Sequence, residues 1–121
     1  MTILSQVKFR QVKNLTTFGQ YLREHRDSKG LTQDQLAREL NIPFTDISKI
    51  EHGKKKFPFN KLKEMADFFE LDFVIVRDRF GADILVEQAL KYGCTEKVFS
   101  FAEDRAKYIA SKKVKQGDLK F

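Results

Sequence analysis

Cysteine is almost absent from this sequence: Cys94 is the single one among 121 residues. One thiol cannot form an internal disulfide, and it cannot supply the paired thiolates of a cysteine-based zinc site. Tryptophan is missing, and only 2 prolines and 6 glycines are present, which excludes collagen-like and low-complexity chains. These absences fit a cytoplasmic protein with one compact domain and an appended arm.

Long hydrophobic runs are also missing. Charged residues interrupt every apolar stretch, including the one at residues 73–76, whereas a membrane-spanning helix needs about 20 apolar residues. The first residues carry Lys8, Arg10 and Lys13 and lack the apolar core of a signal peptide. We therefore expect no membrane association and no export.

Motifs for catalysis and metal binding do not occur in the sequence. His25 and His52 lie far apart in the chain, with no further ligand at metal-binding spacing. No glycine-rich phosphate loop, zincin pattern or nucleophile elbow is present. We predict that the protein is not an enzyme and that it binds no metal or other cofactor.

What the chain does have is an excess of positive charge. Lysine and arginine number 23 against 17 acidic residues, giving a net charge of +6 that favours a polyanionic partner. The densest positive stretch, residues 44–63, contains Lys49, Lys54, Lys55, Lys56, Lys61 and Lys63 against Asp46 and Glu51. The alternative interpretation of such a run is a solvated helical face.

Capping signals predict a mainly helical chain. A first helix is expected to begin after Thr16 or Thr17 and to end near Gly30, because glycine readily adopts the left-handed conformation that ends helices. Thr32 opens a capping box for a second helix over residues 33–40. The break at residues 41–43 then leads to a third helix over residues 44–52.

The second half of the chain is also predicted to be helical. Residues 73–76 fit a helix better than a buried strand, although four residues do not separate the two by periodicity. A helix beginning at Pro58 is expected to carry an apolar stripe of Phe59, Leu62, Met65, Ala66 and Phe69. A last helix from Thr95 is expected to bury Val98, Phe99, Ala102, Ala106 and Ile109, and to be followed by a loose basic tail from Ser111.

One segment, residues 31–53, carries a characteristic pattern. Leu-Thr-Gln precedes the second helix, Leu-Ala lies within it, and Ile-Ser-Lys-Ile-Glu-His-Gly closes the third. From Phe18 to about Asp72 the chain resembles the helix-turn-helix proteins of the phage-repressor (Cro-like, XRE) family. The resemblance implies an all-α fold, a repressor-type helix-turn-helix bundle with a C-terminal helical extension, and double-stranded DNA as the partner.

The resemblance also implies which residues contact DNA. A recognition helix presents its N-terminal residues and one outward face to base edges in the major groove. The residues at the base-reading surface are Phe44, Thr45, Ser48 and Lys49, with Ser48 at its edge. The residues expected to bind phosphate are Gln33, Lys54, Lys55 and Lys56; a solubilising loop is the alternative role for the three lysines. Arg26 and Glu51 occupy positions that form an internal ion pair in several family members.

Three residues depart from the family pattern. Pro43 stands where many members have a capping Ser or Thr, so Thr45 or Asp46 is expected to cap the recognition helix one turn later. Asp46 would repel phosphate unless it caps the helix or accepts a hydrogen bond from cytosine N4. Phe44 is an unusual exposed aromatic residue, and its alternative role is a contact inside the fold.

The chain divides, on this interpretation, into three parts. Residues 1–15 form an N-terminal arm or short strand, residues 16–72 form the DNA-binding domain, and residues 73–121 form a helical extension for dimerisation or partner binding. The expected function is a sequence-specific transcriptional regulator, a homodimeric repressor reading a palindromic operator. The alternative is an antitoxin-like or other protein-interaction module in which DNA binding is secondary.

Overall fold

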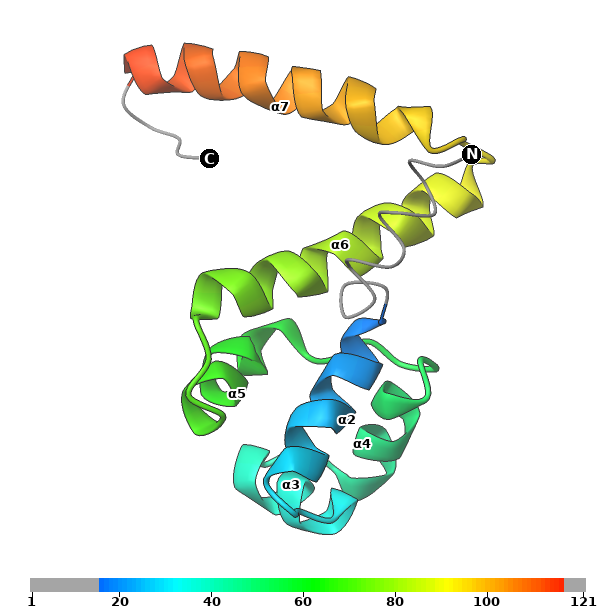
Figure 1. Ribbon diagram of the computed structural model, residues 1–121, viewed down its shortest axis with the longest axis vertical. Helices are drawn as coiled ribbons and strands as arrows, with labels where there is room; N and C mark the ends of the chain where they lie inside the picture. The colour runs from blue at the N-terminus through cyan, green and yellow to red at the C-terminus, as the bar shows by residue number, and fades with distance from the viewer. Residues whose placement is uncertain (1–15, 117–121) are drawn as a thin grey trace. The chain divides into compact units, whose positions relative to one another are not determined.

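The computed structural model describes residues 16–116, whose regular structure is entirely helical (Figure 1). The elements in chain order are α2 (Phe18–Ser28), α3 (Gln33–Leu40), α4 (Phe44–Glu51), the short 3₁₀ helix η2 (Phe59–Lys61), α5 (Leu62–Phe68), α6 (Phe73–Lys91) and α7 (Lys97–Gln116). The predicted all-α fold is confirmed for these residues, and residues 73–76 are helix and not strand. The predicted arm at residues 1–15 lies outside the described residues.

Capping boxes begin the first two helices. The Thr17 hydroxyl accepts the Gln20 backbone N–H at 3.1 Å, while the Gln20 side chain accepts the Thr17 N–H at 2.9 Å. Thr32 and Gln35 repeat this arrangement at 3.1 and 2.8 Å. Each box satisfies two backbone N–H groups that a helix start leaves without partners. The predicted cap at Thr32 is confirmed, and the first cap is Thr17.

Left-handed residues set the turns around α4. Asn41 has φ +53° and ends α3, and Pro43 then precedes the first residue of α4. Gly53 has φ +76°, a conformation that only glycine adopts without strain, and it lies just beyond the last turn of α4. The predicted bounds of these helices are confirmed to within one residue.

The chain divides into two compact units, the first ending at Asp83 and the second beginning at Ile84. The core of the first unit is formed by α2 to α5 and the first half of α6. Its largest fully buried side chains are Leu22, Leu36, Leu40, Ile47, Ile50, Leu62, Met65 and Val76. The Phe18 ring lies 5.5 Å from that of Phe57 and 5.7 Å from that of Phe80, both edge-on.

One predicted core residue of the first unit is exposed. Phe59 was expected to share a stripe with Leu62 and Met65, but 66% of its surface remains accessible. The reason is local, because Phe59 lies in η2, whose different turn geometry takes it out of register with the α5 stripe. Its ring lies 5.9 Å from that of Phe80, at the surface of the core.

The second unit, by itself, contains α7 and the last part of α6. None of the described side chains of α7 is buried, so the prediction that this helix buries five residues is wrong for the single chain. Two helical segments offer too little surface to cover an apolar stripe on each. The basic residues from Ser111 continue α7 as far as Gln116, where a loose tail was predicted.

Candidate nucleic-acid interface

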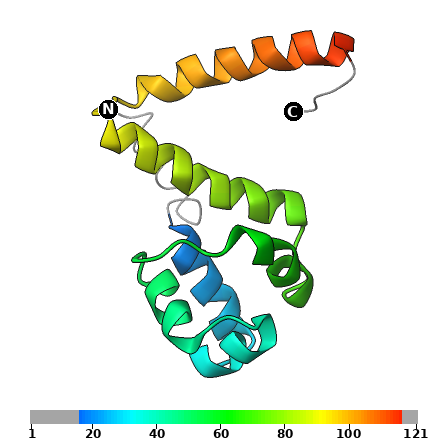
Figure 2. The ribbon, with the colours of Figure 1, turned by 180° about the vertical axis from the view of Figure 1, so that it is seen from behind.

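The helices α3 and α4 form a helix-turn-helix unit. They pack against each other in both views (Figure 1 and Figure 2), and residues 41–43 join them. Leu40 on α3 and Ile47 on α4 are both fully buried. The packing of the two helices fixes the outward side of α4 relative to α3.

The outward side of α4 carries the residues predicted to read bases. Phe44 is 50% exposed, and Thr45 and Lys49 are exposed as well. Ser48 is half-buried, at the margin of this surface. Half of the Phe44 surface is covered and half is open, so Phe44 is not a core residue. The structure thus brings the four residues together on one helix, on the side opposite the buried isoleucines.

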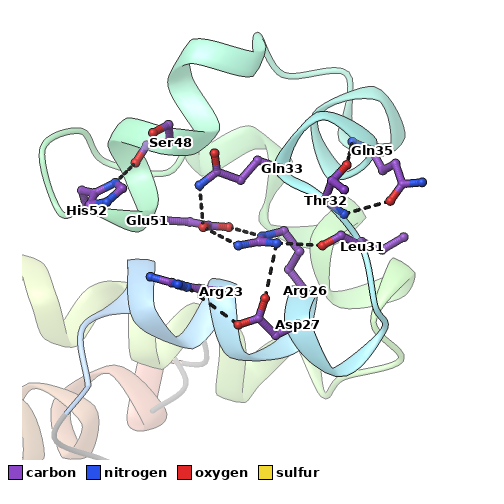
Figure 3. Close-up of polar contacts among 10 residues, drawn as sticks. All are labelled: Arg23, Arg26, Asp27, Leu31, Thr32, Gln33, Gln35, Ser48, Glu51 and His52. Carbon is purple, nitrogen blue, oxygen red and sulfur yellow. Dashed lines mark hydrogen bonds and ion pairs between the residues drawn. The ribbon is translucent and has the colours of Figure 1, made fainter.

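Arg26 and Glu51 form a buried ion pair between α2 and α4 (Figure 3). Arg26 Nε donates to Glu51 Oε2 at 2.6 Å, and Arg26 Nη2 donates to Oε1 at 2.9 Å. Arg26 Nη1 donates to the Leu31 carbonyl at 2.7 Å. The hydrogen bond with Glu51 raises the pKa of Arg26 despite its burial. The predicted internal pair is confirmed.

Gln33 lies at the first position of α3, half-buried, and its amide is held by the same carboxylate. Gln33 Nε2 donates to Glu51 Oε1 at 2.9 Å (Figure 3). Glu51 therefore accepts hydrogen bonds from both Arg26 and Gln33, so one residue of α4 is tied to α2 and to the start of α3. An amide nitrogen carries two protons, which leaves Gln33 a second one to donate.

The three lysines that follow α4 are exposed. The Lys54 backbone N–H donates to the Lys49 carbonyl at 2.8 Å, which closes the last turn of the helix. The Lys55 ammonium donates to Asp46 Oδ2 at 2.9 Å. Sequence reasoning missed this pair, because it joins residues nine positions apart across a turn.

The expected cap of α4 is corrected by these contacts. The N-cap residue is Pro43, and it makes no side-chain capping bond. The Asp46 carboxylate binds Lys55. A proline at the helix start presets a suitable φ, so the helix begins without the side-chain cap that was predicted.

Three further residues hold the unit together, and the sequence patterns did not single them out. A β-carbon at Gly19 would lie 2.1 Å from the Ile50 carbonyl oxygen, so α2 approaches α4 too closely for any side chain. Asp83 Oδ2 on α6 accepts the Phe18 backbone N–H at 2.8 Å, at the start of α2. Phe57 is buried, although it follows three lysines.

Among residues 16–116 no three His, Cys, Asp or Glu side chains are grouped so that they could hold a metal ion. No helix in that part of the chain is both long enough and apolar enough to cross a membrane.

Part of the first unit matches a known protein family. Residues 22–76 match the family model described as Helix-turn-helix. Curated protein sequences include no significant match.

Solved structures show similar chains. The restriction-modification controller protein C.AhdI from Aeromonas hydrophila is 27% identical over 49% of this chain and 89% of its own, with a TM-score of 0.44. The clp gene regulator ClgR from Corynebacterium glutamicum is 22% identical, over 61% of this chain and 79% of its own, with a TM-score of 0.46. A chain of the SinR–SinI complex is also 22% identical, over 78% of this chain and 99% of its own, with a TM-score of 0.46. The match to the helix-turn-helix family model covers residues 22–76, less than half of the chain, and it includes the α3–α4 unit described above.

Proposed function

We propose that this chain is a cytoplasmic, sequence-specific transcriptional regulator that inserts α4 into the major groove of double-stranded DNA. The observation that carries the proposal is the orientation of α4. Its apolar side is buried, its C-terminal residue Glu51 is tied to Arg26, and its outward side is exposed at Phe44, Thr45 and Lys49. The major groove, about 12 Å wide, admits one α-helix presented in this way.

The proposed contacts divide into base reading and phosphate binding. Lys49 can donate to guanine O6 and N7, and Phe44 or the methyl group of Thr45 can pack on a thymine methyl. Ser48 lies at the margin of this set. The phosphate contacts are assigned to Gln33, Lys54, Lys55 and Lys56, at the start of α3 and just beyond α4. Phosphate contacts set register and affinity, whereas base contacts set the preferred sequence.

The proposal extends to a homodimeric repressor that reads a palindromic operator. The support is the second unit, in which large apolar side chains remain exposed, among them Leu85 and Leu90 on α6 and Phe101 and Tyr108 on α7. Exposed apolar side chains in such number are typical of protein interfaces. Two copies would present their α4 helices to half-sites about 34 Å apart.

The DNA-binding proposal is tested by selection from a random duplex library, with the wild-type protein and with Lys49→Ala in parallel. We expect wild type to enrich a palindrome, and Lys49→Ala to bind it about 1–3 kcal/mol more weakly with relaxed preference at one base position in each half-site. An equal loss on selected and shuffled duplexes would show that Lys49 does not read a base. If wild type binds no duplex, the proposed function is wrong.

The dimer proposal is tested by sedimentation of the full chain and of Leu85→Glu. A charge in an apolar interface disrupts association, so Leu85→Glu should be a monomer. Gln88→Glu is the matched control, because it adds the same charge at an exposed position of α6, and it should remain a dimer. A monomeric wild type would instead favour the antitoxin-like alternative, in which these residues bind another protein.

A further inference from the structure

We propose that Asp46 is a specificity-determining residue. Its carboxylate keeps Lys55 from binding a DNA phosphate until the amino group of a base donates a hydrogen bond to that carboxylate and replaces Lys55. This inference rests on the proposed function and concerns the same helix. Every base pair carries one exocyclic amino group in the major groove, so what Asp46 selects is the base that places it within reach of the carboxylate, which is cytosine with N4 or adenine with N6.

The Asp46–Lys55 ion pair depends on the path of the chain around the end of α4. Asp46 lies in the first turn of α4, and Lys55 lies in the segment after its end. The left-handed Gly53 turns the chain at the end of the helix, and the Lys55 ammonium reaches Asp46 Oδ2 at 2.9 Å. The pair therefore links the first turn of the proposed recognition helix to the segment beyond its end.

The two side chains of the ion pair differ in exposure. The Asp46 side chain is 21% exposed and that of Lys55 is 49% exposed, so the carboxylate is partly covered while the ammonium remains accessible. Burial removes part of the water that would hydrate the Asp46 carboxylate, and the Lys55 ammonium compensates for that loss. Removing the ammonium is therefore unfavourable. Lys55 can leave for a phosphate only if another donor replaces it at Asp46.

On a duplex that places no amino group within reach of Asp46, the Asp46 carboxylate and a phosphate compete for the one Lys55 ammonium. Transfer of Lys55 to a phosphate would leave Asp46 uncompensated beside a polyanion, where like charges repel. Lys55 therefore stays on Asp46, and the pair contributes neither a phosphate contact nor counterion release. Binding to random DNA is weakened by this arrangement.

On a duplex with a suitably placed amino group, both charges find partners. Asp46 accepts a hydrogen bond from cytosine N4 or adenine N6, and Lys55 becomes available for a phosphate. Guanine and thymine offer acceptors at the corresponding major-groove edge, apart from the apolar thymine methyl, so they do not satisfy the carboxylate. Discrimination arises because the wrong base leaves a charged group without a partner.

The test compares Asp46→Asn with the wild-type protein on the duplex enriched by wild type and on a shuffled duplex of the same composition, across a series of salt concentrations. Asparagine keeps the size of the side chain and removes the charge that holds Lys55. We expect Asp46→Asn to bind the shuffled duplex more tightly, with a salt dependence steeper by roughly one unit. The ratio of affinities for the two duplexes should fall on the order of tenfold.

The matched control is Asp67→Asn, which breaks the exposed Lys63–Asp67 pair on α5 and changes the net charge equally. It should strengthen binding to both duplexes by the same factor and leave their ratio unchanged. In a Lys55→Ala background, Asp46→Asn should no longer steepen the salt dependence, because the lysine that it releases is gone. Thermal unfolding of each variant confirms that the compared proteins are folded.

Two results would overturn the inference while leaving the proposed function intact. One is an Asp46→Asn protein that changes both duplex affinities as Asp67→Asn does. The other is an undiminished steepening in the Lys55→Ala background, which would mean that the carboxylate acts by its own charge alone. Failure of wild type to bind any duplex would instead overturn both proposals together.

Discussion

Arg26 and Glu51 join α2 to α4 through two parallel hydrogen bonds, and both residues are more than nine-tenths buried. Solvent and salt screen such a pair far less than they screen a surface pair. Removing Glu51 leaves the buried guanidinium with the exposed Asp27 as its counter-charge, at 3.3 Å, and removing Arg26 leaves the Glu51 carboxylate with the neutral Gln33 amide, so either loss is destabilising. The pair thus couples the position of the proposed recognition helix to the folding of the whole first unit.

Glu51→Ala is expected to lower the free energy of unfolding by about 3–5 kcal/mol, because it removes the buried carboxylate that pairs with Arg26 and leaves only the exposed Asp27 as counter-charge. Chemical denaturation measures this loss. The double variant Arg26→Ala with Glu51→Ala should lose clearly less than the sum of the single variants. Strict additivity would show that the two side chains do not stabilise each other.

Gly19→Ala is expected to destabilise the protein, because the new methyl group would lie 2.1 Å from the Ile50 carbonyl oxygen and force α2 away from α4. Overpacking of this kind costs about 1–3 kcal/mol. Gly81→Ala is the control, since nothing lies within 4 Å of its β-carbon position in α6. That substitution should stabilise the helix by roughly 0.5–1 kcal/mol. Equal thermal shifts for the two variants would contradict the close approach.

Lys54→Ala is expected to weaken binding to selected and shuffled duplexes by the same factor, and to reduce the salt slope by roughly one unit, because a phosphate contact is independent of sequence. Fluorescence anisotropy titrations at several salt concentrations measure both quantities. Lys63→Ala on α5 removes the same charge outside the proposed surface and should change the slope less. An unchanged slope for Lys54→Ala would mean that Lys54 makes no phosphate contact.

Acidification is expected to destabilise the protein through His25. Burial lowers the pKa of His25 below the usual value of about 6.5; Glu24 opposes this effect and Arg79 adds to it. Between the lowered pKa and the usual one, the unfolded chain binds more protons than the folded chain. The stability that neutral His25 provides is therefore present at neutral pH and is lost as the pH falls through this interval.

His25→Gln removes the group that titrates and tests this pH dependence. The free energy of unfolding of the variant should fall less than that of wild type between pH 7 and the lowered pKa, as measured by denaturation in a series of buffers. Parallel curves for the two proteins would contradict the assignment.

Local signals made the first helices predictable. The capping boxes at Thr17 and Thr32, and the left-handed residues Asn41 and Gly53, each act within a few positions of the chain, so their effect can be recognised in the sequence. The resemblance to a known family predicted the outward surface of α4 and the ion pair between Arg26 and Glu51. These features account for the helix-turn-helix and for the surface that it presents.

Contacts between distant residues were not predictable in this way. The close approach at Gly19 and the bond from Phe18 to Asp83 exist only because α2 meets α4 and α6. The pairing of Asp46 with Lys55 depends on the path of the chain after Gly53. Periodicity along α7 correctly marks apolar residues, yet it carries no information about what covers them, and for this reason the expected burial was wrong.

The two sides of α4 have separate tasks, and this separation bears on how such a protein can change its target. Ile47 and Ile50 face the core and Glu51 is tied to Arg26, whereas Thr45 and Lys49 contribute little to the packing of the fold. Substitutions on the outward side can therefore accumulate without unfolding the chain. Under the proposed function, a gene duplicate could acquire a new operator through a few such exchanges and inherit a stable fold unchanged.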